Sequence, residues 1–315
     1  MTAIETRPLG GKNPLPVTNF GLGTAPLANL YKPVSEADAI ATVQAAYNSG
    51  IHLFDTAPLY GRGLSETRVG RALAGYPRES YVISTKVGRV LSDDQSSLHF
   101  DYTRDGVLRS LEGSLKRLGM DYVDILHIHD PDNHQHEALE TAFPTLAELR
   151  SQGVIKAIGA GMNQWQTLEH FARHADFDLF LLAGRYTLLE QTSLDFLQLC
   201  QQKGIGIFLG GVYNSGILAT GPQPGAKYNY ADAPDPILHK AAAIQAVCNR
   251  HHTPLHVAAL QFARAHPAVT ALVVGAITPA EVQANLDALS ALIPAALWAQ
   301  LRAQGLIEAD APTPS

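Results

Sequence analysis

Residues 102–130 read YTRDGVLRSLEGSLKRLGMDYVDILHIHD, a helical pattern followed directly by a strand pattern. Apolar residues recur every three or four positions across 103–118, with Thr103 placed to cap this helix and Gly119 placed to end it. Residues 122–129 then form a short apolar run that is typical of a buried strand. The stretch therefore predicts one helix-to-strand step of an α/β fold.

The same alternation continues in both directions along the chain. Short runs rich in β-branched residues predict eight strands, over 17–23, 51–55, 81–86, 122–129, 154–159, 178–183, 205–209 and 269–274. Amphipathic runs predict helices that begin at Ser35 or cover 65–74, 103–118, 137–152, 163–174, 192–203, 237–250, 254–265 and 279–289. This order predicts an α/β protein of the (β/α)8 TIM-barrel class.

The glycines after the first predicted strand argue against a doubly wound sheet. Residues 21–26 read GLGTAP, which lacks the third glycine of a dinucleotide fingerprint, and Pro26 stands where the helix should begin. The chain also lacks the G-x-x-x-x-G-K-[ST] phosphate-binding loop. Because no change of composition marks a second domain, we expect residues 1–315 to form a single barrel domain, with a short N-terminal extension and a short C-terminal tail. The aperiodic stretch 212–236 is expected to be a functional loop.

Composition limits the classes of function. The 315 residues are 46% hydrophobic and 17% charged, which is a globular composition, and the net charge of −6 with no basic run argues against a nucleic-acid partner. Cys200 and Cys248 form no C-x-x-C pair, and no apolar run approaches the roughly 18 residues of a membrane span. Residues 1–11 show no signal-peptide pattern. We expect a cytoplasmic monomer or small homo-oligomer that acts on a small molecule.

Polar residues end three consecutive predicted strands, where a barrel carries its chemistry. Asp55, Lys86 and His129 end the second, third and fourth strands, and Tyr60 lies in the loop after Asp55. A lysine ammonium beside the tyrosine is expected to lower a pKa that is ordinarily about 10. Asp55 can hold Lys86 beneath Tyr60, and His129 can orient a substrate oxygen. These residues predict an acid–base site that interconverts carbonyl and alcohol groups.

Three segments that carry these residues resemble the aldo-keto reductase superfamily. Residues 50–61 (GIHLFDTAPLYG) resemble the segment around its catalytic Asp and Tyr, 84–86 (STK) the segment of its Lys, and 118–129 (LGMDYVDILHIH) the segment of its His. The resemblance extends over nearly the whole chain. It implies a (β/α)8 barrel that binds a nicotinamide cofactor at the C-terminal face without a Rossmann domain, and it assigns the catalytic roles to the four residues named above.

Within the family, the chain resembles the sugar-oxidising branch, namely the L-fucose, D-threo-aldose and L-galactose dehydrogenases, with a bacterial pyridoxal 4-dehydrogenase close by. In residues 158–165 (IGAGMNQW), Asn163 keeps the position that holds the nicotinamide amide. Met162 replaces the usual serine there. Both positions are expected at the cofactor.

A second loop also matches this branch. Residues 211–218 (GVYNSGIL) replace a Ser-Pro-Leu-Gly run whose backbone N–H groups contact the cofactor pyrophosphate in relatives. The resemblance therefore places Gly211, Tyr213 and Ser215 at the cofactor. Gly210 replaces an aromatic residue that stacks on the nicotinamide in relatives, and Tyr213 is a candidate to compensate.

The last predicted strand leads into the segment expected to choose between NAD and NADP. In NADP-preferring relatives, a Lys stands at the Gly275 position and an Arg at the Glu281 position, and both bind the 2′-phosphate. A carboxylate repels that phosphate but can accept a hydrogen bond from a free ribose hydroxyl. We therefore expect NAD to be preferred and NADP to be the alternative. Glu281 can also serve only as a first-turn acid of its helix, and Asn285 is expected at the adenine.

The resemblance implies oxidation of the anomeric carbon of an aldose to a lactone, with Tyr60 as the acid–base residue. Asp130 stands where relatives carry a bulky aromatic residue, and a carboxylate suits a polyol because it accepts hydrogen bonds from hydroxyl groups. Trp165 and Tyr213 are candidate walls of the substrate pocket. Dehydrogenation of pyridoxal and general aldehyde reduction are the alternatives within the family.

Two classes of protein remain as alternatives to an oxidoreductase, a metal-dependent barrel hydrolase and a non-catalytic nicotinamide-binding barrel. His127 and His129 lie on one face of a strand, as at the start of a metal site in a barrel hydrolase. The later strands, expected to end at Gly159, Gly184 and Gly275, supply no further ligands, so we expect no metal and interpret His127 as a histidine bonded to Ser84. A non-catalytic nicotinamide-binding barrel is disfavoured because all four catalytic residues are present.

Overall fold

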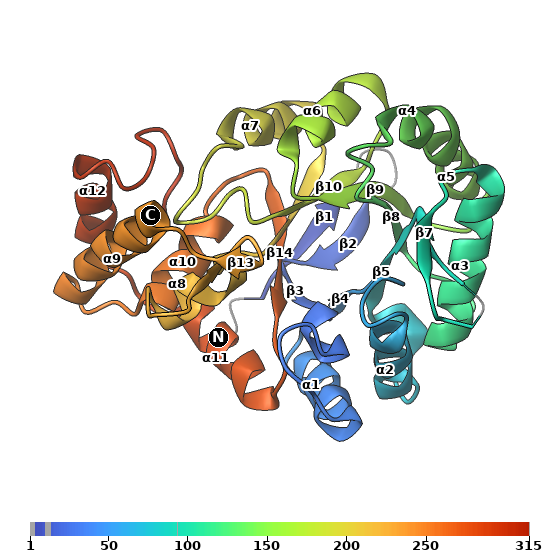
Figure 1. The fold of residues 1–315 in the computed structure, drawn as a ribbon, viewed down its shortest axis with the longest axis horizontal. Helices are drawn as coiled ribbons and strands as arrows, with labels where there is room; N and C mark the ends of the chain where they lie inside the picture. The colour runs from blue at the N-terminus through green and yellow to red at the C-terminus, as the bar shows by residue number, and fades with distance from the viewer. Residues whose placement is uncertain (1–3, 10–13, 93, 315) are drawn as a thin grey trace.

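The computed structural model describes residues 4–9, 14–92 and 94–314, and its centre is a closed barrel of eight parallel strands (Figure 1). The barrel strands are β3 (Phe20–Gly23), β4 (Leu53–Asp55), β5 (Val82–Val87), β8 (Ile125–His129), β9 (Ala157–Met162), β10 (Leu179–Ala183), β11 (Gly206–Gly210) and β14 (Val269–Gly275). Each strand pairs with the next in this order, and β14 closes on β3. The predicted (β/α)8 barrel is confirmed.

Helices surround the barrel. They are α1 (Glu36–Asn48), α2 (Leu64–Leu73), α3 (Arg104–Leu118), α4 (Gln135–Glu137), α5 (Phe143–Ser151), α6 (Trp165–His174), α7 (Leu194–Lys203), α8 (Ile217–Thr220), α9 (Asp235–Arg250), α10 (Leu255–Arg264), α11 (Pro279–Ser290) and α12 (Ala295–Ala303), with short turns η1 (Ala25–Ala28), η2 (Arg78–Ser80), η3 (Ala138–Ala142) and η4 (Asn214–Gly216). The side chains of Ser35, Thr103 and Thr278 cap α1, α3 and α11 as expected. None of the described helices is both long enough and apolar enough to cross a membrane.

A hairpin closes the N-terminal end of the barrel. Its strands, β1 (Thr6–Leu9) and β2 (Leu15–Thr18), pair antiparallel and lie at the centre of the ring of strands in Figure 1. The hairpin side chains Leu9, Leu15 and Val17 are buried in one cluster with inward-facing residues of the barrel strands. This end of the barrel interior is therefore filled with apolar side chains.

The strand register gathers polar side chains at the opposite, C-terminal end. Asp55 of β4 lies beside Ser84 of β5, and Lys86 of β5 lies beside His127 of β8. Because side chains alternate along a strand, residues two apart share the inner face, so Ser84 and Lys86 both point inward. The polar layer thus lies directly above the apolar interior.

Several elements differ from the sequence prediction. The first predicted strand divides into β2 and β3, because the chain turns at Asn19 between the hairpin and the barrel. Strand β9 begins later than expected and continues to Met162, so the prediction that it ends at Gly159 is wrong. The helix expected over 137–152 is interrupted by the π turn η3. The N-terminal extension lies partly outside the described residues.

Several elements were not predicted, among them β1, the short helices α4 and α8, and five more that lie outside the predicted pattern. These five are the strands of two hairpins, β6 (Arg89–Leu91) with β7 (Leu98–Phe100) and β12 (Lys227–Tyr228) with β13 (Ala231–Asp232), and the helix α12. The hairpin strands are too short to show a periodicity of two. Both hairpins follow barrel strands, β5 and β11, on the side of the barrel that carries the polar layer.

The contact between α2 and α3 gives a test of the packing. A Cβ added at Gly70 would lie 2.0 Å from the carbonyl oxygen of Leu118, so Gly70→Ala must push the two helices apart. We expect the free energy of unfolding to fall by about 1–3 kcal/mol, the usual cost of overpacking. Gly75→Ala is the matched control, because a Cβ there meets nothing within 4 Å. Equal denaturation midpoints for the two variants would contradict this packing.

Candidate active site

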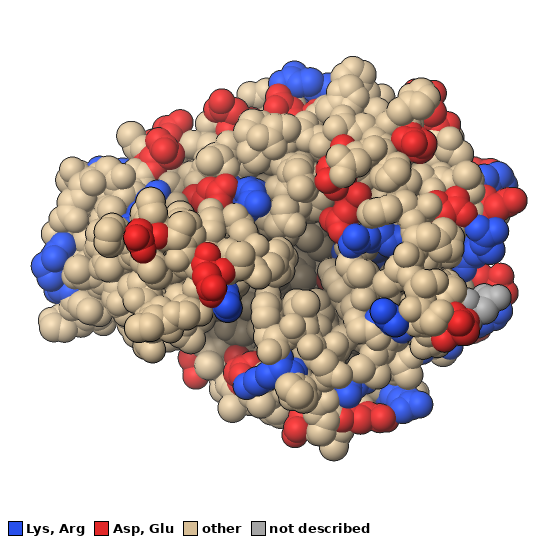
Figure 2. Space-filling model, viewed as in Figure 1, with Lys and Arg blue, Asp and Glu red and all other residues tan. Residues whose placement is uncertain are grey.

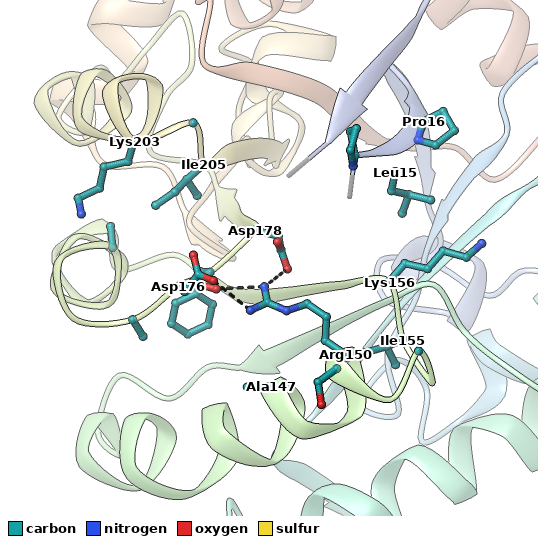
Figure 3. Close-up of a pocket in the computed structure, with 17 residues that line it drawn as sticks. Leu15, Pro16, Ala147, Arg150, Ile155, Lys156, Asp176, Asp178, Lys203 and Ile205 are labelled. Atoms are coloured by element: carbon teal, nitrogen blue, oxygen red, sulfur yellow. Dashed lines mark hydrogen bonds and ion pairs between the residues drawn. The ribbon is translucent and has the colours of Figure 1, made fainter. Parts of the chain in front are cut away.

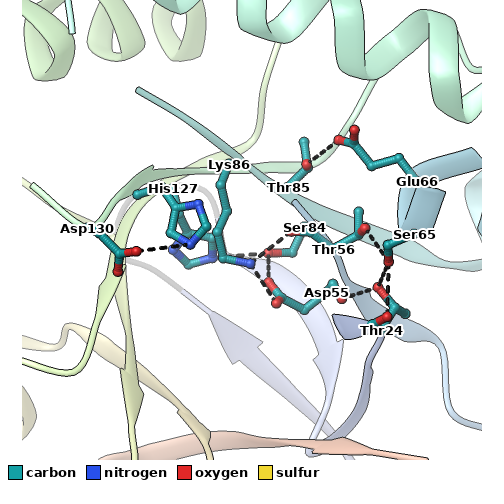
Figure 4. Close-up of polar contacts among 11 residues, drawn as sticks. Thr24, Asp55, Thr56, Ser65, Glu66, Ser84, Thr85, Lys86, His127 and Asp130 are labelled. Carbon is teal, nitrogen blue, oxygen red and sulfur yellow. Dashed lines mark hydrogen bonds and ion pairs between the residues drawn. The ribbon is translucent and has the colours of Figure 1, made fainter. Parts of the chain in front are cut away.

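Asp55 and Lys86 form a buried ion pair at the C-terminal end of the barrel (Figure 4). Lys86 Nζ donates to Asp55 Oδ1 at 2.7 Å and to the carbonyl oxygen of Thr56 at 2.8 Å. Burial lowers the pKa of the Lys86 ammonium, but Asp55 and Tyr60 raise it more, so the pKa is raised overall. Lys86 is therefore a fixed positive charge inside the barrel mouth.

Tyr60 lies next to this pair although it comes from a loop, between β4 and α2. Its ring centroid is 4.8 Å from Lys86 Nζ and 6.1 Å from the ring centroid of His129, which it meets edge to face. The loop depends on Gly61, whose φ is +59° and where a Cβ would lie 2.7 Å from the Cβ of Ala28. The fold thus brings together Asp55, Tyr60, Lys86 and His129.

The pKa of Tyr60 is raised to about 12, so the expected net lowering is wrong. Desolvation of the phenol raises the pKa and outweighs Lys86, which lowers it, while Asp55 and Asp130 raise it further. The sign of the lysine effect is as expected. The sequence does not reveal the burial, because Tyr60 is in a loop.

The two histidines of β8 are neutral and have different surroundings. Burial lowers the pKa of both rings well below the usual value, and the Lys86 ammonium lowers it further. His127 Nε2 lies 3.0 Å from Ser84 Oγ, as predicted, and Ser84 donates to Asp55 Oδ2 at 2.9 Å. Because the Ser84 proton is used in that bond, His127 Nε2 must be the donor to Ser84. A chain of hydrogen bonds therefore fixes the Asp55 carboxylate from below.

Asp130 borders the same site and has an ionic partner that the sequence analysis missed. Its Oδ2 lies 2.9 Å from Arg89 Nη1 and 3.7 Å from His129 Nε2. The Tyr102 hydroxyl donates to the carbonyl oxygens of His129 and Asp130. In the sequence, Arg89 is marked only by its place three residues after Lys86 and directly after a glycine, and neither feature indicates a contact with Asp130. Figure 2 shows that this face of the molecule is hollowed near its centre, with basic and acidic side chains interspersed around it.

The residues expected at the nicotinamide, Met162 and Asn163, lie together at the end of β9. Asn163 directly follows β9, and its Nδ2 donates to the carbonyl oxygen of Ala183 at the end of β10. Met162 is 2% exposed. Its side chain belongs to the main hydrophobic cluster, which lies between the barrel strands and the surrounding helices. A contact of Met162 with a ligand is therefore limited to its backbone.

The loop after β11 has the backbone shape of an anion cradle. Gly211, Asn214, Ser215 and Gly216 all have positive φ. A Cβ at Gly211 would lie 3.0 Å from the backbone nitrogen of Gly184, so this loop approaches the end of β10 closely. Turns of this kind can direct backbone N–H groups toward a bound anion. The N–H groups of Asn214 and Gly216 donate within the loop, to the carbonyl oxygens of Gly211 and Tyr213. The pyrophosphate that the family resemblance implies would therefore have to bind other N–H groups of this loop.

The last strand and α11 carry the residues expected at the adenosine. Tyr213 donates through its hydroxyl to Asn285 Oδ1 at 3.1 Å, which links the loop after β11 to α11. Glu281 Oε2 accepts a hydrogen bond from the backbone N–H of Ile277 at 2.8 Å, so this carboxylate caps the start of α11. Trp165 begins α6 and packs against the main core cluster.

A separate cavity of about 1130 Å³ opens at the N-terminal end of the barrel (Figure 3). Its wall includes residues just before β9, β10 and β11, which places it away from Tyr60. Arg150 reaches into it but is paired with Asp176 and Asp178, at 3.1 and 2.6 Å. Lys156, which also lines the cavity, pairs with Asp124 at 2.7 Å, so these two cations are neutralised by their neighbours.

Comparison with known proteins supports an interpretation of the polar layer as an active site. The profile described as the Aldo/keto reductase family matches residues 19–304. The chain belongs to the aldo/keto reductase family. It is therefore an oxidoreductase of a family that binds nicotinamide cofactors, and the resemblance inferred from the sequence motifs is confirmed.

Three curated relatives of this aldo/keto reductase match over most of its length. A pyridoxal 4-dehydrogenase of Microbacterium luteolum is 40% identical, and a D-threo-aldose 1-dehydrogenase of a Pseudomonas species is 38% identical, each over 98% of this chain and 99% of the relative. An L-galactose dehydrogenase of Arabidopsis thaliana is 32% identical over 93% of this chain and 90% of the relative.

Solved structures agree with the barrel. An aldo-keto reductase of Bacillus halodurans in its holo form superposes with a TM-score of 0.79, at 25% identity and over 97% of both chains. A glycerol dehydrogenase of Gluconobacter oxydans shares the fold, with a TM-score of 0.74 at 21% identity over 100% of both chains.

Proposed function

We propose that this aldo/keto reductase oxidises the anomeric carbon of an aldose to the lactone, with NAD as the hydride acceptor. The observation that carries the proposal is the Lys86–Asp55 ion pair beside Tyr60 and His129, with the Asp130 carboxylate at the same mouth. The names of the relatives, a D-threo-aldose 1-dehydrogenase and an L-galactose dehydrogenase, support an aldose of the L-fucose, L-galactose or D-arabinose type.

Each residue of the site has a part in the proposed reaction. Tyr60 takes the proton of the anomeric hydroxyl as the C1–O bond becomes the lactone carbonyl, and Lys86, held by Asp55, stabilises the phenolate. Neutral His129 orients the reacting oxygen. A nicotinamide held at the ends of β9 and β11 would supply the acceptor for the hydride of C1. In the reverse direction, Tyr60 returns the proton to the oxygen of the reduced carbonyl.

The substrate side of the site favours hydroxylated molecules. Asp130 offers an acceptor to substrate hydroxyl groups, whereas a hydrophobic substrate would exclude water from the carboxylate oxygen that Arg89 does not bind and would give it no donor. Trp165 and Tyr213 are proposed pocket walls. Because the Tyr213 hydroxyl bonds to Asn285, we place Tyr213 on the cofactor side of the pocket, together with Asn163, Gly211 and Ser215.

The preference for NAD rests on the absence of a cation where NADP carries its extra phosphate. The sequence from Gly275 to Asn285 contains no lysine or arginine. A Cβ at Gly275 would lie 2.8 Å from Pro26 Cγ, so a longer side chain there would require Pro26 to move. Glu281 adds a negative charge at the start of the same helix, where it would repel a phosphate.

Glu281→Gln tests the role of this charge. The amide oxygen can still accept from Ile277, so the cap is kept while the charge is removed. Because Glu281 is exposed and screened, we expect the ratio of kcat/KM for NAD to that for NADP to fall several-fold. Asp287→Asn, a charge removal farther along α11, is the control and should not change the ratio. If the ratio of kcat/KM for NAD to kcat/KM for NADP is unchanged in both variants, Glu281 caps the helix but does not select the cofactor.

The proposed reaction is tested by nicotinamide reduction with the purified protein. NAD and NADP are each assayed against L-fucose, L-galactose, D-arabinose, D-glucose and pyridoxal. Turnover of an aldose with NAD supports the proposal. If every sugar is inactive while simple aldehydes are reduced with NADPH, both the aldose assignment and the NAD preference are wrong.

Pyridoxal dehydrogenation is the second candidate, and the 40% identical relative of that name favours it. Pyridoxal is also a hydroxylated aldehyde, so the same contacts of Asp130 would apply. Oxidation of pyridoxal with no aldose turnover would decide for this candidate.

A further inference from the structure

The ion pair of Arg89 and Asp130 stands at the mouth of the active site and is not part of the proton-transfer group. Their side chains are 27% and 30% exposed, so the pair is accessible from the hollow yet partly desolvated. Among the described residues, the polar contacts of the Asp130 side chain, to Arg89 and His129, involve Oδ2. Oδ1 is therefore available to accept hydrogen bonds from a substrate.

Arg89 is fixed from the side of the β6–β7 hairpin. It pairs with Phe100 in the hairpin register, and its guanidinium lies 4.9 Å from the centroid of the Phe100 ring. Phe100 in turn stacks on Tyr102 at 6.0 Å. A stacked guanidinium loses less freedom when it binds a carboxylate than a free side chain does.

Asp130 is fixed independently, through its backbone. Its φ is +45°, an uncommon conformation for a residue with a side chain. The backbone N–H donates to the carbonyl oxygen of Gly161 at 3.0 Å, and the carbonyl oxygen accepts from the Tyr102 hydroxyl at 3.1 Å. This turn directs the carboxylate toward both Arg89 and the reacting end of the site. Tyr102 contacts both halves of the arrangement.

We propose that Arg89 is a positioning residue that holds the Asp130 carboxylate ready for substrate hydroxyl groups, so that the pair selects substrates with a hydroxyl beside the reacting carbon. The inference rests on the proposed function and names its specificity device. A carboxylate accepts hydrogen bonds and donates none. A substrate without hydroxyl groups therefore displaces water from Asp130 Oδ1 without replacing the hydrogen bonds that the water donated. A hydroxylated substrate replaces those hydrogen bonds.

The charges around Asp130 predict how the arrangement depends on pH. Burial raises the pKa of Asp130, Arg89 and Lys86 lower it, and Asp132 raises it, with a net increase. Loss of Arg89 therefore raises the pKa further, and the carboxyl group takes up a proton at a higher pH. Protonation turns an acceptor oxygen into a donor. His129, which also faces Asp130, loses one of the cations that keep it neutral.

Two aldehydes of equal chain length separate these effects. Glyceraldehyde and propanal differ only in two hydroxyl groups, and both are assayed as reductions with NADH. We expect Arg89→Met to lower kcat/KM for glyceraldehyde by about tenfold or more, mainly by raising KM. This is the effect expected when one charge-assisted hydrogen bond between Asp130 and the substrate is lost. Propanal should change less than twofold, and Arg89→Lys should restore part of the glyceraldehyde activity.

The pH profile adds a readout that general loss of structure would not give. As the pH is lowered, the ratio of kcat/KM for glyceraldehyde to kcat/KM for propanal falls when Asp130 takes up a proton. In Arg89→Met, this fall should begin at a higher pH than in the wild type. Any change at His129 affects both aldehydes and cancels in the ratio. Arg109→Met is the matched control, because it breaks an Arg–Asp pair with Asp101, 2.6 Å apart, beside the same hairpin.

The outcomes are distinct. Equal losses for both aldehydes, no loss for either, or a wild type that does not favour glyceraldehyde would each overturn the role of Arg89. An Arg89-dependent preference for glyceraldehyde in a protein that oxidises no aldose would leave this inference standing and reject anomeric oxidation alone.

Discussion

Tyr60→Phe is expected to lower turnover by about 10²- to 10⁴-fold in both directions, the usual contribution of a positioned acid–base group. The variant loses only the hydroxyl that exchanges a proton with the substrate oxygen, while the ring keeps its edge-to-face contact with His129. Turnover is measured by absorbance of the reduced nicotinamide. Tyr47→Phe, which removes a hydroxyl bonded to Ser80 away from the site, is the control and should keep full activity.

The pH dependence of the wild type tests the same assignment. With a Tyr60 pKa of about 12, the phenolate fraction rises about tenfold for each pH unit below that value. Oxidation needs the phenolate, so its rate should increase as pH rises. Reduction needs the phenol, which predominates throughout that range, so its rate should change little. An oxidation rate that falls with rising pH would exclude Tyr60 as the base.

Lys86→Met is expected to have the second largest effect, on stability as well as on turnover. The substitution leaves the Asp55 carboxylate buried without its cation, which costs about 3–5 kcal/mol when a buried pair is broken. It also removes the charge that lowers the pKa of Tyr60, so the pKa rises further and oxidation slows. The midpoint of chemical denaturation and the turnover number are measured on the same preparation.

A double variant separates the two effects. In Asp55→Asn with Lys86→Met, no uncompensated charge remains, and the asparagine oxygen can still accept from Ser84. We expect much of the lost stability to return while turnover stays low, because the phenolate still lacks its cation. Recovery of both properties together would show that Lys86 acts only by supporting the fold.

The barrel and the four catalytic candidates could be predicted because both depend on local signals. Strand runs ending in Asp55, Lys86 and His129 indicate where the side chains emerge, and parallel pairing in sequence order brings them to one edge. The bond between His127 and Ser84 follows from the same alternation.

What could not be predicted depends on burial and on contacts across loops. The raised pKa of Tyr60 reflects how deeply a loop residue is enclosed, and Glu281 caps a helix through a single oxygen that sequence spacing does not specify. Arg89 was missed because it reaches Asp130 only through a hairpin of three-residue strands. The extension of β9 to Met162 follows from its pairing with β10 rather than from its own residues.

The β1–β2 hairpin covers the N-terminal end of the barrel interior with apolar side chains. Leu9 and Leu15 of the hairpin pack in one cluster with apolar side chains of the barrel strands, so the described interior beneath the Asp55–Ser84–His127 hydrogen bonds is apolar. We therefore expect substrate and product to pass the C-terminal rim, where Arg89 and Asp130 lie beside His129. If the loops that carry Arg89 and Asp130 select the substrate as proposed, the same loops are expected to affect how quickly the product leaves before the next turnover.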